Sequence, residues 1–284
     1  MTEADFDALR SFLKARSGLA LTAEKRYLVE SRLGPVCQRF GIASLSALIG
    51  RLKGAPDPAL EQAVVEAMTT NETFFFRDRT PFDLFRQVLL PGCLAARGST
   101  RRIRIWCAAA STGQEPYSLA MILKESAQKL TGWNIEILAT DISTEVLEKA
   151  KAGYYTQFEV QRGLPIQLLL KYFTQEGDRW RISEEIRSMV QFKPLNLIHS
   201  FGALGTFDII YCRNVLIYFD APTKADVLRR IAQALNPGGA VLLGAAETVI
   251  GLSDALVPHP EHRGLYVPSR PAEATAPLRL VASR

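Results

Sequence analysis

Short apolar segments and helix-like segments alternate along this chain from about residue 101 onward. The apolar segments lie at 102–107, 135–139, 190–192, 207–212 and 240–243. Longer stretches between them carry helical signals, as at about 223–235. Strands that alternate with helices form parallel βαβ units. The sequence therefore predicts an α/β fold built on a doubly wound sheet.

The first 80 residues follow a different pattern, with helical periodicity and no strand-like run. Phe6, Leu9 and Leu13 recur at helical spacing. Asp57 and Pro58 combine a helix cap with a proline suited to the first helical turn. We predict a small all-α domain with its linker at 1–78, followed by an α/β domain at 79–268.

Two further segments fall outside the α/β repeat. The segments at 180–182 and 186–192 are too short for another strand and helix, which predicts a small antiparallel insert at about 172–192. Residues 269–284 are rich in Ala, Pro and Arg, and this composition is typical of a disordered tail.

The composition bears on the partners and the compartment. A net charge of +5 suits a negatively charged partner, either nucleic acid or an acidic protein, or simply keeps the chain soluble. The helical region shows no RNA-binding module or aromatic stacking platform, so we expect no nucleic acid partner. Four scattered cysteines, an acidic N-terminus and no apolar run near ~20 residues predict a cytoplasmic protein with reduced thiols and no membrane insertion. Of the three histidines, His259 and His262 lie near each other without further ligand candidates, so we expect no metal site.

Candidate binding residues follow the first two predicted strands, because open α/β sheets bind ligands at the carboxyl ends of strands. The loop at 108–118 has small side chains that let a ligand approach the backbone, or that simply form a tight turn. It lacks the GxGxxG pattern, which disfavours an NAD enzyme. Glu115 would oppose a phosphate and tolerate a cationic amino or sulfonium group. Asp141 suits either a ribose diol or a helix-capping turn, and with the loop it indicates a nucleoside ligand.

Five segments resemble those of a known family and occur in the same order. They lie at 69–77, 108–118, 139–143, 196–197 and 212–220, and the last reads CRNVLIYFD. The sequence is similar to the CheR family of chemotaxis receptor methyltransferases over about residues 5–267. The resemblance implies a helical domain packed over a Rossmann-like methyltransferase domain that contains an antiparallel insert.

The resemblance also implies an activity and a set of site residues. The activity is methyl transfer from S-adenosylmethionine to glutamate carboxylates on the cytoplasmic helices of methyl-accepting chemoreceptors, with S-adenosylhomocysteine as the second product. By position, the expected cofactor contacts are Asn71, Thr73, Arg77, Ala109, Glu115, Asp141, Asn196, Leu197, Arg213 and Asn214. Arg77 and Tyr218 match the positions beside the reacting groups. From the residues alone, Arg77 also suits a surface cation, Arg213 a structural ion pair, and Tyr218 a core aromatic.

Receptor docking is expected through the second helix of the N-terminal domain. Its basic residues are Lys25, Arg26, Arg32 and Arg39, which also suit an ordinary solvated face, and Pro35 is expected to bend it. The turn at 174–178 is shorter than in family members that bind a receptor C-terminal peptide, so we predict independence from that tether. A monomer is the family default. Two alternatives remain open: a methyltransferase for RNA, a small molecule or another substrate, and a non-catalytic S-adenosylmethionine sensor.

Overall fold

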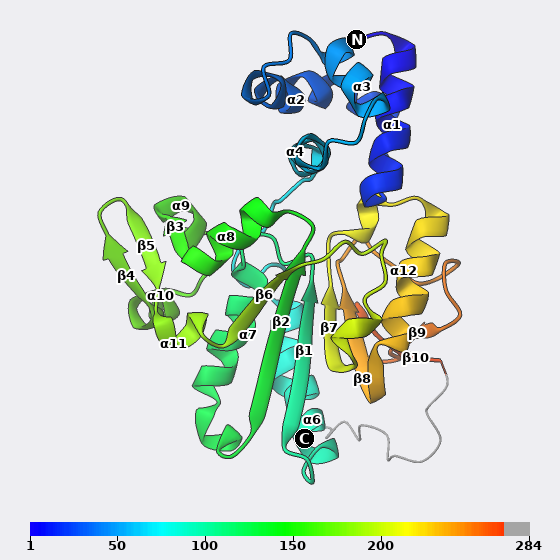
Figure 1. Ribbon diagram of the computed structural model, residues 1–284. Coiled ribbons are helices and arrows are strands. Elements are labelled where there is room, and N and C mark those ends of the chain that lie inside the picture. The colour runs from blue at the N-terminus through cyan, green and yellow to red at the C-terminus, as the bar shows by residue number, and fades with distance from the viewer. Residues whose placement is uncertain (270–284) are drawn as a thin grey trace.

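The computed structural model describes residues 1–269, and its main feature is a seven-stranded sheet beneath a group of N-terminal helices (Figure 1). The strand order is β6-β2-β1-β7-β8-β10-β9. The bounds are β1 Arg102–Ala108, β2 Asn134–Asp141, β6 Val190–Pro194, β7 Phe207–Cys212, β8 Leu235–Leu243, β9 Leu256–Pro258 and β10 Leu265–Pro268. The strands from β6 to β8 are parallel, and β10 and β9 pair antiparallel at one edge. The predicted α/β class is confirmed.

The strand order reverses between β1 and β7, which makes this the switch point of the sheet. From β1 the chain continues to β2 and then β6 on one side, whereas β7 continues to β8 on the other. Ile105 of β1 pairs with Ile137 on one side and Ile209 on the other, so β1 is central. Ligands of doubly wound sheets bind at the carboxyl ends of the strands at such a point.

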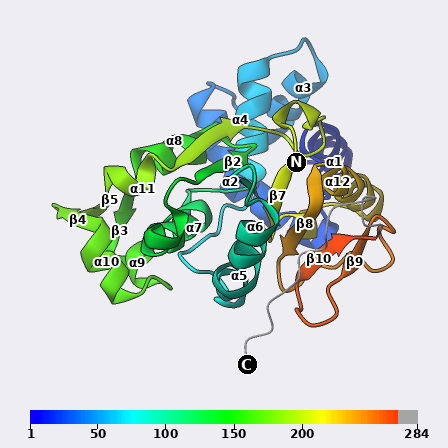
Figure 2. The same cartoon turned by 90° about the horizontal axis from the view of Figure 1, so that it is seen from below.

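Helices cover both faces of the sheet (Figure 2). One face packs against α7 (Gln114–Glu125) and against a helical stretch formed by α5 (Thr80–Leu84), the π-helical turn η2 (Phe85–Leu89) and α6 (Leu90–Ala96). The other face packs against α12 (Ala221–Gln233). Every residue of β7 is buried, as expected of a parallel strand covered on both sides. The 3-10 turns η3 (Ala127–Leu130) and η4 (Gly202–Leu204) lie in connections.

The N-terminal domain has its own apolar core, formed by amphipathic helices. Its elements are α1 Glu3–Ser17, the 3-10 turn η1 Ala23–Lys25, α2 Tyr27–Arg39, α3 Leu45–Lys53 and α4 Pro58–Met68. The side chain of Asp57 accepts a hydrogen bond from the amide of Leu60 and caps α4. Thr22 precedes η1, and its side chain makes no cap hydrogen bond. Pro35 lies inside α2.

The antiparallel insert differs from its predicted range of about 172–192. A second sheet, in the order β3-β5-β4, consists of β3 Tyr154–Thr156, β4 Phe173–Glu176 and β5 Arg179–Ile182. Helices α8 (Thr144–Ala152), α9 (Gln157–Gln161), α10 (Ile166–Tyr172) and α11 (Glu184–Arg187) flank it. The insert therefore starts near 154, and 190–194 belongs to the main sheet. The physical reason is that Tyr155 packs edge-on against Phe75, which fixes a three-residue strand too short to show periodicity.

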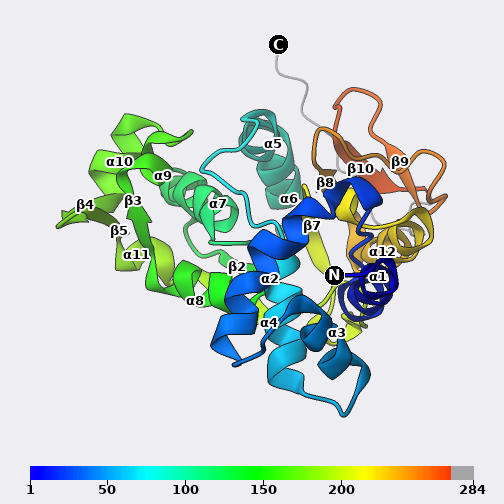
Figure 3. The same cartoon turned by 90° about the horizontal axis from the view of Figure 1, so that it is seen from above.

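The N-terminal domain contacts the carboxyl ends of the main strands directly (Figure 3). The amide of Ala20 donates to the Tyr218 carbonyl at 2.8 Å, and Lys14 forms a salt bridge with Asp220 at 2.6 Å. The Asn196 side chain donates to the carbonyl of Arg16 at 2.7 Å. The loop that follows α1 is thus fixed against the segment that follows β7.

Two sequence expectations concern the ends and the surface of the chain. Among the described residues, no helix combines the length and apolar character needed to cross a membrane. The predicted disordered tail at 269–284 lies outside the described residues, apart from Ser269.

Candidate active site

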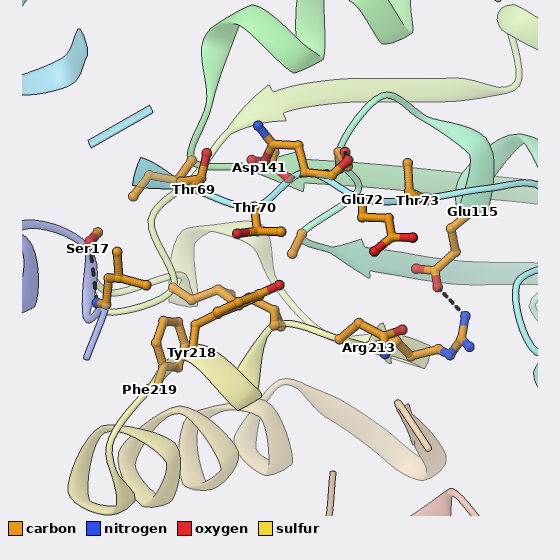
Figure 4. A pocket seen from close by; sticks show the side chains of 18 of the residues that line it. Ser17, Thr69, Thr70, Glu72, Thr73, Glu115, Asp141, Arg213, Tyr218 and Phe219 are labelled. Carbon is orange, nitrogen blue, oxygen red and sulfur yellow. Dashed lines mark hydrogen bonds and ion pairs between the residues drawn. The ribbon is translucent and has the colours of Figure 1, made fainter. Parts of the chain in front are cut away.

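A pocket opens at the switch point, between the N-terminal domain and the carboxyl ends of β1, β2 and β7 (Figure 4). About 950 Å³ of space lies between its walls, a figure that includes the solvent at its open mouth. All eleven predicted site residues line it: Asn71, Thr73, Arg77, Ala109, Glu115, Asp141, Asn196, Leu197, Arg213, Asn214 and Tyr218. The structure therefore brings together residues that are far apart in the sequence, from Asn71 to Tyr218.

The loop after β1 presents its backbone to this pocket. Ala109 and Ser111 adopt positive φ angles of 65° and 49°, which small side chains accommodate with less crowding than large ones. The amide of Ser111 donates to Asp141 Oδ2 at 2.8 Å, and its hydroxyl donates to the carbonyl of Asn71 at 2.9 Å. One loop thus connects the interdomain linker to the end of β2.

Asp141 is the buried acceptor of the site, with 6% of its surface exposed. Its Oδ1 accepts from the amide of Ser143 at 3.0 Å, while Oδ2 accepts from Ser111. Burial raises the pKa of Asp141, although these two amide donors oppose the shift. Each carboxylate oxygen has two lone pairs, so acceptor capacity remains for a ligand diol. The helix cap of α8 is made by the Ser143 side chain, not by Asp141.

Arg213 forms the centre of a buried ionic network beside the pocket (Figure 4). Its side chain is 1% exposed and contacts Glu115 Oε2 at 2.8 Å, Asp78 Oδ2 at 2.7 Å and the carbonyl of Arg77 at 3.0 Å. Burial raises the pKa of Glu115, and the Arg213 guanidinium works in the opposite direction. Arg213 Nε is buried without a hydrogen-bond partner within residues 1–269. The structural ion pair considered for Arg213 thus exists, and Arg213 and Glu115 also line the pocket, whereas Asp78 does not.

Arg77 lies in the linker between the two domains and faces the same pocket. Its Nη1 donates to the carbonyl of Glu72 at 2.7 Å, and its guanidinium carbon lies 5.5 Å from the ring centroid of Phe74. Glu72 also lines the pocket and forms a salt bridge with Arg162 at 2.6 Å. This bond from Arg162 lowers the pKa of Glu72. A carboxylate therefore stands near Arg77 at the pocket wall.

Tyr218 ends the 3-10 turn η5 (Leu216–Tyr218), which follows β7. The residue is half-buried and lines the pocket, so it is not a fully buried core aromatic. The Nζ atom of Lys25 lies 5.7 Å from its ring centroid. A cation from the N-terminal domain thus lies near the ring of Tyr218, although Lys25 itself does not line the pocket.

Several pocket residues were not predicted from the sequence. Ser17 and Leu19 come from the end of α1, and Glu72 comes from the linker. No periodicity or motif marks Ser17 or Leu19, because they reach the pocket only through the packing of one domain on the other. The five matched segments contained Glu72, so its position beside Asn71 and Thr73 was the available signal.

The charged side chains of the pocket favour a cationic ligand over a polyphosphate. Three carboxylates line it, from Glu72, Glu115 and Asp141, against the guanidinium groups of Arg77 and Arg213. Within residues 1–269, no three or more His, Cys, Asp and Glu side chains are grouped to hold a metal ion.

Comparison with known proteins covers both domains. The family described as "CheR methyltransferase, all-alpha domain" matches residues 4–69, and "CheR methyltransferase, SAM binding domain" matches residues 71–262. Chemotaxis protein methyltransferase 1 of Pseudomonas aeruginosa is 45% identical over 255 residues, covering 88% of this chain and 92% of that protein. Chemotaxis protein methyltransferase Cher2 of Pseudomonas putida is 42% identical over 254 residues, with the same two coverages, 88% and 92%. A chemotaxis protein methyltransferase of Vibrio parahaemolyticus is 42% identical over 257 residues, covering 89% and 92%.

Proposed function

Because this chain belongs to the CheR methyltransferase family, we propose that it methylates glutamate side chains on the cytoplasmic helices of chemoreceptors. It is an S-adenosylmethionine-dependent methyltransferase. The observation that supports the proposal most strongly is the convergence of all eleven predicted residues on one pocket at the switch point. The products would be glutamyl methyl esters and S-adenosylhomocysteine.

The donor set of the pocket fits S-adenosylmethionine. Asp141 offers acceptor capacity for the ribose hydroxyls, and the loop after β1 offers main chain that small side chains leave accessible. Glu115 and Glu72 place negative charge where a sulfonium and an ammonium group are to be held. Asn196 and Leu197, which follow β6 beside the end of β2, complete the contacts that we assign to the cofactor.

The proposed reaction does not need a strong general base. When bound, S-adenosylmethionine supplies a methyl group on a positively charged sulfur. A glutamate side chain has a pKa near ~4.3, so the acceptor is already a carboxylate at neutral pH. Because opposite charges are lost as the ester forms, a pocket that excludes water favours the reaction. The absence of a histidine from the lining residues is consistent with this chemistry.

The residues beside the reacting groups would then act mainly by position. We assign Arg77 to holding the substrate carboxylate, since a guanidinium can bind two carboxylate oxygens and aim one of them. Its carbonyl accepts from Arg213, so the main chain of Arg77 is itself fixed. Tyr218 would orient the same carboxylate through its hydroxyl. In-line alignment of this kind contributes a large share of catalysis in bimolecular transfers.

The test is transfer of tritium from labelled S-adenosylmethionine to a chemoreceptor cytoplasmic fragment, followed by mild alkali. Release of the label as methanol is the expected result, because a carboxyl ester is labile to alkali. Arg77→Ala should lose most turnover while remaining folded, whereas Arg86→Ala removes an arginine from outside the pocket and should retain activity. Cofactor binding without alkali-labile label on several receptors would instead favour a sensor or another substrate class.

Docking of the receptor is proposed on the basic residues of the N-terminal domain at 1–78. Arg26 and Arg32 already donate to Met1 and to Met68 within that domain. Lys25, beside Tyr218, and Arg39 are therefore the residues that we expect to contribute most. The variant Lys25→Ala/Arg39→Ala should raise KM for the receptor fragment and leave the Kd for S-adenosylmethionine unchanged.

A receptor tethering peptide is not expected to bind the insert. Glu176 of β4 pairs with Arg179 of β5, so only Gly177 and Asp178 form the turn, and Gly177 has a φ of 64°. This turn offers little additional surface. Receptor fragments with and without their C-terminal peptide should be methylated at the same rate. We further propose a cytoplasmic monomer, which sedimentation of the purified protein would test for its mass.

A further inference from the structure

Glu247 is a buried acidic residue that does not line the pocket, yet it binds the segment that carries much of the site. Its carboxylate accepts from the amides of Asn214 (2.8 Å), Gly244 (2.7 Å), Val215 (2.9 Å), Leu216 (2.7 Å) and Ile217 (3.4 Å). The residue is 8% exposed. Within residues 1–269 no salt bridge involves Glu247, so main-chain amides balance its charge.

The segment held by Glu247 joins β7 to α12 and contains three predicted site residues, Arg213, Asn214 and Tyr218. Its backbone leaves the strand direction at Asn214, which has a positive φ of 57°. Asn is one of the residues that adopt this conformation most readily. The row of hydrogen bonds to Glu247 holds the main chain on both sides of this turn.

The end of β8 must approach this segment closely for the carboxylate to reach it. A Cβ atom on Gly244 would lie 2.7 Å from Glu247 Oε2 and 2.9 Å from the amide nitrogen of Asn214. Only glycine fits there without a shift of the main chain. Gly244 therefore allows the close approach, and Glu247 makes the hydrogen bonds that join the end of β8 to the segment after β7.

We propose that Glu247 is a positioning residue for methyl transfer. Its carboxylate fixes the main chain at 214–217 and thereby places the Tyr218 hydroxyl at the pocket. This inference rests on the proposed function, because the benefit of that placement is alignment of the methyl acceptor. Glu247→Gln would replace one acceptor oxygen by an NH2 group that faces main-chain N–H donors, whereas Glu247→Asp would keep the charge on a side chain one methylene shorter.

A purely structural role for Glu247 predicts a different outcome, and Asp208 provides the matched control. Asp208 is also a buried carboxylate, 3% exposed, and accepts from Arg97 Nε at 2.8 Å and from the Arg104 amide at 2.8 Å. It lies near the start of β7, at the opposite end of the strand from Arg213. Asp208→Asn should therefore lower the melting temperature and leave kcat near that of the original protein.

The experiment combines hydrogen exchange with kinetics on the full chain. In Glu247→Gln we expect faster exchange in the peptide covering 213–219. We also expect kcat to fall about 10- to 100-fold, the effect of a misplaced reacting group. The Kd for S-adenosylmethionine should change less than kcat, because only Arg213 and Asn214 of the expected cofactor contacts lie in this segment, whereas Glu115 lies in α7 and Asp141 ends β2. Glu247→Asp should have a kcat between those of Glu247→Gln and the original protein. If Glu247→Gln does not fold, the same exchange and kinetic measurements are made on Glu247→Asp.

Three results separate the possible failures. Unchanged exchange at 213–219 in Glu247→Gln would overturn the inference without any receptor being present. Faster exchange with unchanged kcat, or an equal loss of kcat in Asp208→Asn, would show that Glu247 only stabilises the fold. If the original protein transfers no methyl group to a receptor fragment, the proposed function fails, while the exchange still decides whether Glu247 holds the segment.

Discussion

Replacement of Arg213 by Met should destabilise the protein far more than the loss of an ordinary surface ion pair. The guanidinium is 1% exposed, and its partner Glu115 has a side chain that is 11% exposed. Without Arg213, the Glu115 carboxylate would be buried with no remaining cationic partner within hydrogen-bond distance among the described residues. Removing one partner of a buried pair typically costs about 3–5 kcal/mol. Asp78 is 39% exposed and adds little.

Two further variants test whether the loss of stability in Arg213→Met comes from the buried charge of Glu115. Arg213→Met/Glu115→Gln removes both charges, so it should be more stable than Arg213→Met alone, with a coupling of about 1–3 kcal/mol. Arg86→Met breaks an exposed pair with Asp83 and should change the free energy of unfolding by less than about 1 kcal/mol. Urea unfolding without cofactor, followed by both tryptophan fluorescence and circular dichroism, would measure these differences and reveal any separate unfolding of the two domains.

The pH dependence of the Arg213→Met variant follows from the same carboxylate. Burial already raises the pKa of Glu115, and loss of the opposing guanidinium would raise it further. An acid whose pKa is higher in the folded state favours folding below its unfolded pKa and loses that contribution as the pH rises through the folded value. The variant should therefore be least stable, relative to the original protein, at high pH. A cost below about 1 kcal/mol that does not vary with pH would refute the buried-charge explanation.

Three other predictions concern the pocket and the domain contact. Tyr218→Phe should lower kcat by about 10-fold without changing the Kd for S-adenosylmethionine, since one orienting hydrogen bond is worth about 1 kcal/mol or slightly more; equal kcat values would remove Tyr218 from its role. Asp141→Asn should weaken cofactor binding by about 10- to 100-fold in calorimetry, because a charged acceptor becomes neutral; unchanged affinity would contradict the assignment to ribose. Hydrogen bonds from Lys14 and Thr223 lower the pKa of Asp220 from 3.8 to about 2. The stability that this carboxylate contributes is therefore present above its ordinary pKa and is lost as the pH falls toward 2. Lys14→Ala should raise the Asp220 pKa in an NMR titration, and an unchanged pKa would show that the salt bridge is not formed in solution.

The main sheet could be predicted because its strands are buried on both faces and read as continuous apolar runs. The capping of α4 by Asp57 could also be predicted, since it depends on residues three positions apart. The start of the insert could not be predicted from the sequence. The three residues of β3 carry no periodicity of their own, and Tyr155 takes its place by packing against Phe75 from the interdomain linker. Local sequence signals cannot report a strand that a distant side chain fixes.

The candidate site shows the same division between local and long-range information. Asp141 and the small-residue loop could be placed in advance because they follow strands whose carboxyl ends must converge. Glu247 could not, since its role arises only when the end of β8 lies beside the segment after β7. The proposed roles of Arg77 and Tyr218 came from resemblance, and the structure adds their common location in the pocket.

The segment that ends at Tyr218 is held from both sides. The position of the N-terminal domain therefore affects the geometry of the site. Glu247 binds its amides from the sheet side, while the amide of Ala20 binds the Tyr218 carbonyl from the domain above. The chain can turn into this contact because Gly18 ends α1 with a φ of 77°; a Cβ atom there would lie 2.7 Å from Ile198. A side chain at position 18 would separate the two domains at the pocket. The helical domain therefore contributes to the geometry of the site, in addition to carrying the proposed docking residues, since the position of Tyr218 depends on both contacts.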